Sequence, residues 1–165
     1  MAKKKSFQLT PLTILFIVTA AVAVLAAIFF FFLPLTTYKV PITGKTIHTK
    51  FKDIWDIVND FGGDRAGFIR TELIIMIILT IVFIAAGVLK LFAAKQAKLL
   101  SIVTAAAALL FVIVLLSLMS NLGSTKNIFL DFEKAFKNSG AGFIMAFIFG
   151  LIGLGSSVGE IVLNK

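Results

Sequence analysis

Four long apolar runs without a single charged residue constrain this chain more than any other feature. They cover residues 12–33, 73–89, 99–120 and 141–159. A helix needs about 20 apolar residues to cross about 30 Å of hydrocarbon. Because a chain of 165 residues cannot build a soluble core large enough to hide all four runs, they predict an all-α integral membrane protein with four transmembrane helices in a bundle.

The same runs define the domain organisation. The hydrophobic fraction is 59% and the charged fraction is 15%, against about a quarter charged residues in soluble domains. We expect one membrane domain over residues 1–165, with two outer loops at about 34–70 and 121–140. The expected spans are residues 12–33, 71–92, 99–120 and 141–161.

The ends of two spans need an explanation of their own. The second run is the shortest, so we expect Lys90 at its end to extend its ammonium group to the headgroups. The first run continues through Phe29 to Leu33, which is longer than the apolar region of a cleavable signal peptide. We therefore expect this segment to stay in the protein as a span.

Lysines near the span ends predict the orientation. Lys3, Lys4 and Lys5 precede the first span, and the connector after the second span holds Lys90, Lys95 and Lys98 without an acidic residue. The opposite loops carry more basic residues in total, but the first span usually dominates. We therefore expect the protein in the plasma membrane with both termini in the cytoplasm. The sequence contains no Asn-x-Ser/Thr glycosylation site, which is compatible with a bacterial source.

The first outer loop, which is extracytoplasmic in this orientation, contains two patterns. Alternating apolar residues flank Thr43–Gly44, which predicts a small β-hairpin that Pro41 limits to an edge or a bulge. Phe51, Ile54, Trp55 and Val58 then follow helical spacing, which predicts a short amphipathic helix that Gly62–Gly63 would end.

Aromatic residues around both outer loops fit the membrane interface, where amphipathic rings are enriched. Phe129, Phe132 and Phe136 are spaced three and four apart, which indicates either a helix on the outer surface or an extension of the last span. The expected interfacial anchors are Tyr38, Trp55, Phe129, Phe132 and Phe136.

The last span carries a face of small residues. Gly142, Ala146, Gly150 and Gly153 share one side of the predicted helix, and Gly155 and Gly159 form a second stripe. Small residues let helix backbones approach closely in a membrane. The face fits packing within the chain's own bundle against small residues of the first and third spans. It also fits a partner interface, self-association or, less well, the lining of a pore.

Two acidic residues lie near span ends and are candidates for charge pairs. Glu72 falls in the first turn of the expected second span, where the helix dipole favours an anion, so we interpret it as an interfacial cap. Glu160 lies in the last turn of the fourth span, and we expect it to pair with Lys90 or Lys95. Ion coupling is the alternative for both residues, since ionisable groups within spans often mark transport.

Catalytic and cofactor chemistry find no support in the sequence. The chain has no cysteine, and His48 is its single histidine, so thiol catalysis and a multi-histidine metal site are excluded. The loop acids Asp53, Asp56 and Asp60 have helical rather than calcium-loop spacing. The net charge of +8 comes from lysines near span ends, where anionic lipid is the natural partner. We expect no enzyme activity, no cofactor and no nucleic acid.

The layout resembles that of claudin-like tetraspan proteins: four spans, a larger first outer loop with strands and a short helix, and a smaller second outer loop. The first loop carries Trp55 but lacks the two cysteines of the claudin motif, so no residue role is transferred. The resemblance transfers no function either. Because no charged residue is central in a span, we expect a non-enzymatic accessory, scaffold or assembly protein. It would contact another membrane protein or a second copy through the first outer loop and the glycine face of the last span. A subunit of an oligomeric transporter or channel is the alternative, and an immunity protein that shields the membrane is a variant of the first hypothesis.

Overall fold

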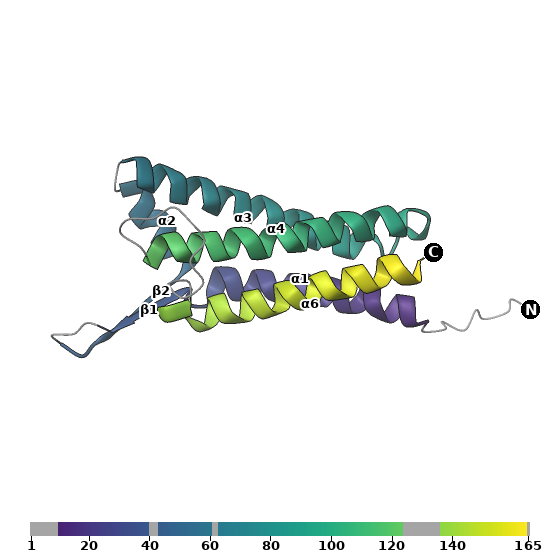
Figure 1. Ribbon diagram of the computed structural model, residues 1–165, viewed down its shortest axis with the longest axis horizontal. Helices are drawn as coiled ribbons and strands as arrows, with labels where there is room; N and C mark the ends of the chain where they lie inside the picture. The colour runs from purple at the N-terminus through teal and green to yellow at the C-terminus, as the bar shows by residue number, and fades with distance from the viewer. Residues whose placement is uncertain (1–9, 40–42, 61–62, 124–135, 165) are drawn as a thin grey trace, which may run out of the picture.

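Four long antiparallel helices form the body of the computed structural model, which describes residues 10–39, 43–60, 63–123 and 136–164. Each is long and apolar enough to cross a membrane, so the prediction of a mostly helical chain with four such helices is confirmed (Figure 1). The helices are α1 (Pro11–Phe32), α3 (Asp64–Leu89), α4 (Ala97–Gly123) and α6 (Ala141–Leu163).

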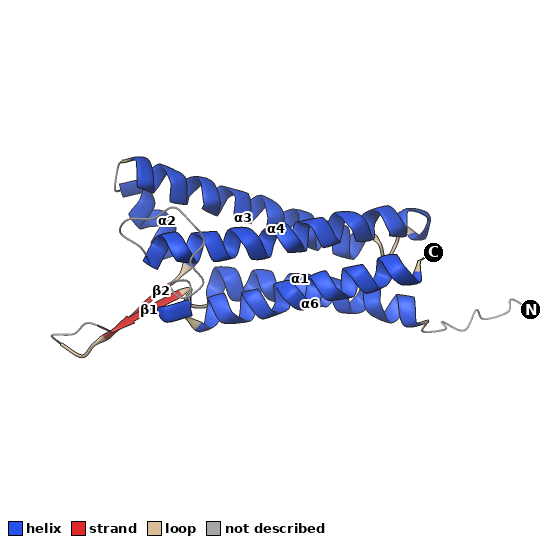
Figure 2. Cartoon of the chain, viewed as in Figure 1, coloured by secondary structure: helices blue, strands red, loops and turns tan. Residues whose placement is uncertain are grey.

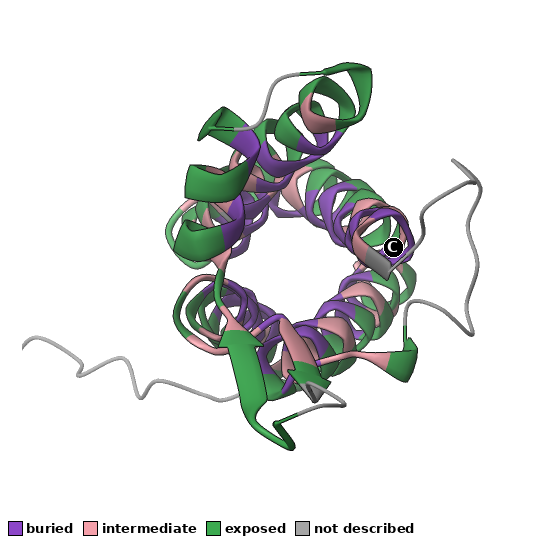
Figure 3. Cartoon of the chain, turned by 90° about the vertical axis from the view of Figure 1, so that its left-hand side faces the viewer, coloured by how far each residue is buried: buried purple, intermediate pink, exposed green. Residues whose placement is uncertain are grey.

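Helices that follow one another in the chain are neighbours in the bundle. α1 packs on α3, α3 on α4, α4 on α6, and α6 closes the ring against α1. Figure 3 looks along the bundle and shows the buried faces turned inward. We call the end with the strands the hairpin end. The opposite end, where α1 begins, α6 ends and the 3-10 helix η1 (Ala94–Gln96) joins α3 to α4, is the connector end.

One helix begins about two turns before the span that was predicted within it. The second span was expected to start at residue 71, but α3 starts at Asp64, directly after Gly63 at φ 121°. Its polar first turns continue the helix beyond the apolar run, because a helix can extend into the headgroup layer or water. α4 likewise reaches from Ala97 to Gly123, past both ends of its predicted span.

The hairpin end carries the remaining elements of the described chain (Figure 2). β1 (Thr36–Lys39) pairs antiparallel with β2 (Thr46–Thr49), so that Tyr38 lies opposite Ile47. Gly44 has φ 64° in the connection between the strands, a conformation that glycine adopts without strain. Pro41 lies outside the described residues.

α2 (Phe51–Asp60) follows β2 directly. Ile54 and Val58 are buried, and the acidic residues lie on the exposed side of the helix. Asp53 Oδ2 accepts a hydrogen bond of 2.8 Å from the backbone N–H of Lys50 and thereby caps the first turn. The predicted amphipathic helix is therefore confirmed. Gly62, one of the two residues expected to end it, lies outside the described residues.

Backbone hydrogen bonds join the start of α6 to the end of α1. The N–H of Gly142 donates to Pro34 O, and the N–H of Gly140 donates to Leu35 O, both at 2.8 Å. The N–H of Thr37 in turn donates to Asn138 O at 2.8 Å. These bonds fix the strands against the mouth of the bundle.

Large apolar side chains fill the centre of the bundle. The largest fully buried ones include Phe30, Phe83, Phe111, Phe143 and Met76. Apolar side chains also face outward along every long helix, among them Ile14, Ile75, Ile113 and Leu151. Such an outer surface suits lipid rather than water as the surrounding solvent.

The small residues of α6 face inward where neighbouring helices come closest. A Cβ atom on Gly142 would lie 2.7 Å from Leu33 O, and one on Gly153 would lie 2.3 Å from the ring of Phe83. A Cβ on Gly150 would meet Val112 at 2.8 Å, and Ala146 is fully buried. This face therefore packs inside the chain's own bundle. Gly155 points into open space, and Gly159 lies at the edge of α1 beside Leu15.

A glycine-to-alanine substitution at two positions of α6 distinguishes the contribution of packing to stability from that of helix propensity. Gly142→Ala places its methyl group against backbone carbonyls that cannot move aside, so we expect a loss of about 1–3 kcal/mol in stability. Gly155→Ala has no contact to disturb and gains up to about 1 kcal/mol from helix propensity. Unfolding by SDS titration from mild detergent measures both. Equal stabilities of the two variants would contradict the α1–α6 contact.

Candidate functional site

A buried ion pair lies at the connector end of the bundle. Lys90 Nζ is 2.6 Å from Glu160 Oε2, and both side chains are 0% exposed. Lys90 follows the last residue of α3, and Glu160 lies in the last turn of α6. The ammonium group also lies 5.7 Å from the ring centroid of Phe16 in α1, within reach of a cation–π interaction.

Hydroxyl groups from the other helices complete the site. Ser101 in α4 donates to Glu160 Oε2 and Thr19 in α1 donates to Glu160 Oε1, each at 2.6 Å. Ser156 lies 2.7 Å from the Thr19 hydroxyl. Each hydroxyl also has a backbone acceptor in its own helix, Leu15 O at 2.9 Å for Thr19 and Gly153 O at 3.1 Å for Ser156, so either can be the donor of the bond between them. We call these residues the Glu160 cluster; its members are Thr19, Lys90, Ser101, Ser156 and Glu160.

Every one of the four long helices or their caps contributes to the Glu160 cluster. A charge buried in low dielectric is costly unless it is paired and hydrogen-bonded. Both carboxylate oxygens of Glu160 are satisfied, by one cation and two hydroxyl donors. The cluster therefore requires all four helices to hold one relative position at this end.

The structure corrects one prediction here and agrees with another. Lys90 does not extend to the headgroups: its ammonium group lies over the Phe16 ring inside the bundle, because Glu160 offers a buried partner. Glu160 was expected to pair with Lys90 or Lys95, and it pairs with Lys90, whereas Lys95 is exposed. The sequence alone did not indicate Thr19, Ser101 and Ser156 as members of a site. The positions of Ser101 and Ser156 on the inward faces of their helices could have identified them as members of a buried polar site.

A second buried carboxylate lies at the hairpin end. Glu72 in α3 is 5% exposed, and its oxygens accept hydrogen bonds from Ser117 and Asn121 of α4. The interpretation of Glu72 as an interfacial cap in the first helical turn is wrong. Because α3 starts at Asp64, Glu72 lies well inside the helix and faces its neighbour. It ties α3 to α4 as Glu160 ties the opposite end.

Apolar side chains separate the two polar sites. Phe30 and Phe111 have ring centroids 6.0 Å apart, and Phe83 lies 6.3 Å from Phe111. Thr80 and Thr104 are buried but donate to carbonyl groups of their own helices, Met76 O and Leu100 O. Within the described ranges, no hydrogen-bonded chain connects Glu72 with Glu160.

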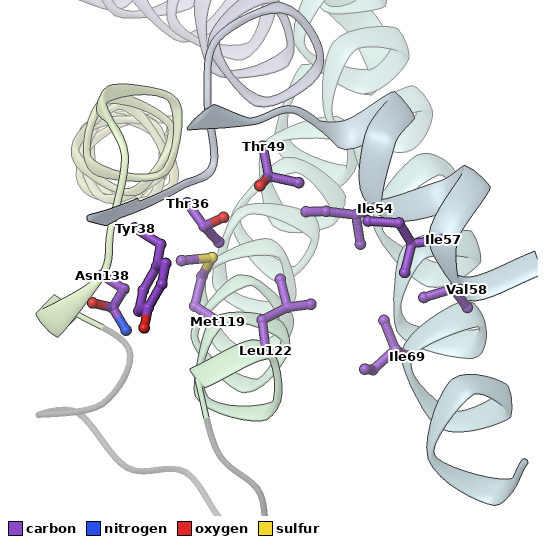
Figure 4. A pocket seen from close by; sticks show the side chains of 10 residues that line it. All are labelled: Thr36, Tyr38, Thr49, Ile54, Ile57, Val58, Ile69, Met119, Leu122 and Asn138. Carbon is purple, nitrogen blue, oxygen red and sulfur yellow. The ribbon is translucent and has the colours of Figure 1, made fainter. Parts of the chain in front are cut away.

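A pocket of about 330 Å³ opens at the hairpin end, within the volume range of small-molecule sites (Figure 4). α2 and α3 supply an aliphatic wall, and α4 adds Met119 and Leu122. The strands and the segment before α6 add polar groups. The described lining residues are Thr36, Tyr38, Thr49, Ile54, Ile57, Val58, Ile69, Met119, Leu122 and Asn138.

The predicted aromatic anchors have different surroundings. Tyr38 is exposed and lines the pocket. Trp55 is half-buried and stacks on Phe51 at 6.2 Å between ring centroids. Phe136 packs edge-on against Phe143 and Phe147. Phe129 and Phe132 lie outside the described residues.

Comparison with known proteins gives no relative: no family model, no curated protein and no solved structure matches this chain. The claudin-like resemblance therefore stays a prediction. Within residues 10–39, 43–60, 63–123 and 136–164, no group of three or more His, Cys, Asp or Glu side chains could hold a metal ion.

Removing the carboxylate charge of the Glu160 cluster tests its role directly. Glu160→Gln leaves Lys90 buried without its counter-ion, so we expect a loss of about 3–5 kcal/mol in unfolding free energy. The double variant Lys90→Met plus Glu160→Leu removes both charges and should recover most of that loss. SDS or thermal unfolding in mild detergent measures each variant. A single variant as stable as the wild type would contradict the burial of Lys90.

Proposed function

We propose that this protein is a non-enzymatic accessory or assembly protein of the membrane, which binds another membrane protein through the elements at its hairpin end. The support comes from two sides. Fully buried aromatic side chains fill the centre of the bundle, so the described interior offers no continuous polar route. The hairpin end, in contrast, presents structured elements beyond the spans (Figure 1).

The observation that carries the proposal is an exposed apolar pair on the hairpin. Tyr38 and Ile47 lie opposite each other in the antiparallel register, and they are 51% and 49% exposed. The hairpin points away from the bundle (Figure 1), so the pair is not covered by the long helices. An aromatic next to a β-branched residue on a small projecting sheet suits a protein contact, where tyrosine is enriched.

Site-specific photo-crosslinking in native membranes tests this proposal. A photoreactive residue at position 47 should give one adduct of defined mass with a membrane protein or a second copy. Phe92, which is 82% exposed at the connector end, is the matched control position and should give no such adduct. Tyr38→Ser should reduce the yield at position 47. Equal adduct patterns from both positions would contradict the proposal.

We place the protein in the plasma membrane with both termini in the cytoplasm, so that the hairpin end lies outside. The support is the lysine triplet before the first span, since the first span usually dominates orientation. Because the chain contains no cysteine, single cysteines can report the sidedness. An impermeant maleimide should label His48→Cys in intact cells and Lys95→Cys only after permeabilisation, since both positions are exposed. The opposite labelling pattern would reverse the orientation.

A second candidate function has its own observation. The Glu160 cluster and Glu72 are ionisable groups buried between helices, and such groups often mark ion or proton pathways. A transporter or channel subunit would complete a pathway by oligomerising. Ion flux into liposomes that contain the pure protein, lost in the double variant Lys90→Met plus Glu160→Leu, would favour this function over assembly.

A further inference from the structure

The pocket at the hairpin end lies where the apolar spans meet the polar loops. Ile69 lines it from α3, just before the apolar run that starts at residue 73, and Leu122 lines it from α4, just after the run that ends at residue 120. This is the level of lipid headgroups and of the first part of their acyl chains. The natural occupant at this depth is part of a lipid molecule.

Two arginines bind backbone carbonyls of the helices that form the pocket. Arg70 donates to the backbone carbonyl of Val58, a lining residue, at 3.3 Å. Arg65 donates to the carbonyl of Asn121, next to the lining residue Leu122. Neither arginine is among the lining residues. Each guanidinium group is instead bonded to the backbone of a lining residue or of its neighbour in the chain, Arg70 on α2 and Arg65 on α4.

The two guanidinium groups keep donors available. Each carries five N–H donors, and each makes one side-chain hydrogen bond to a backbone carbonyl. In the described part of the chain, the single ion pair is that of Lys90 with Glu160. Both arginines are exposed, and the acids of α2 lie on that helix's outer face, with Asp53 engaged by the N–H of Lys50.

The lining of the pocket is itself amphipathic. Ile54, Ile57, Val58 and Ile69 form one wall, and Figure 4 shows Tyr38 and Asn138 together on the other side. An aliphatic wall suits an acyl chain, and polar groups near the strands suit ester oxygens. A volume of about 330 Å³ suits a segment of one chain rather than a whole lipid.

From this combination we propose that the pocket binds an anionic glycerophospholipid, with one acyl chain against Ile57 and Ile69 and the phosphate at Arg65 and Arg70. Guanidinium groups bind phosphate oxygens through paired N–H donors. A neutral apolar ligand would not use this basic rim, and a soluble anion would not use the aliphatic wall. Tyr38 belongs both to the exposed hairpin pair and to the pocket lining, whereas Ile47 does not line the pocket. Crosslinking at position 47 therefore reports a protein partner separately from lipid in the pocket.

Photolabelling of the full-length protein tests the site. The protein is reconstituted in phosphatidylcholine vesicles with a trace of phosphatidylglycerol that carries a photoreactive acyl chain. We expect labelled peptides to contain Ile57, Met119 or Leu122. Arg65→Gln and Arg70→Gln should each lower the labelling of these peptides about fivefold. Lys45→Gln, which removes an exposed charge of the hairpin turn, should leave it unchanged.

A further variant and two further probes distinguish lipid bound in the pocket from other causes of photolabelling. Ile57→Trp, at a position that is half exposed and so tolerates a larger side chain, should fill the pocket and abolish the labelling. Thermal unfolding of each variant in detergent confirms that it is folded. Equal labelling by a phosphatidylcholine probe, labelling that survives Ile57→Trp, or complete competition by millimolar inorganic phosphate would each overturn the lipid site. A crosslinked partner at position 47 would be unaffected by these results.

Discussion

The structure depends on two buried carboxylates, Glu160 and Glu72, whose ion-pair and hydrogen-bond partners come from neighbouring helices. The outer surfaces of these helices are apolar. In lipid, apolar side chains on the outside give no hydrophobic drive toward one another, so close packing and polar contacts must hold the helices together. The Glu160 cluster does so at the connector end, where Thr19, Lys90 and Ser101 reach the carboxylate from α1, the end of α3, and α4. Glu72 with Ser117 and Asn121 does so at the hairpin end.

Between these two polar sites, close packing of small and aromatic side chains holds the helices together. Gly142 and Gly153 allow α6 to approach the backbone of α1 and the ring of Phe83. Phe30, Phe83 and Phe111 fill the space that remains at the centre. The hairpin end carries elements that do not belong to the spans: the strands, α2 and the pocket that they form with α3 and α4.

Much of this fold could be predicted from the sequence because hydropathy and periodicity report it directly. Charge-free runs predicted four spans, and the spacing of Ile54 and Val58 predicted α2. The start of α3 could not be predicted that way, since its first turns are polar and hydropathy detects only the part within hydrocarbon. For the same reason, the sequence put Glu72 in the first turn of the helix instead of well inside it.

The polar sites were harder to predict, because their members come from distant parts of the chain. The pairing of Glu160 with a lysine followed from charge, but the choice between Lys90 and Lys95 required the direction in which Lys90 leaves α3. Thr19 and Ser156 are separated by 137 residues, and no pattern within one helix reveals such a contact. The pocket likewise requires three helices and both strands to be in place.

The most direct measurement of the central claim is a disulfide between the interior faces of α1 and α6 in the membrane. The chain has no cysteine, and the hydroxyl oxygens of Thr19 and Ser156 lie 2.7 Å apart. Thr19→Cys with Ser156→Cys should form an intramolecular disulfide in the membrane fraction on mild oxidation, whereas Ile17→Cys with Ser156→Cys should not, because Ile17 faces outward. Reduced thiols at both inward positions after oxidation, or recovery of the chain in the detergent-free soluble fraction, would contradict the four-helix membrane bundle.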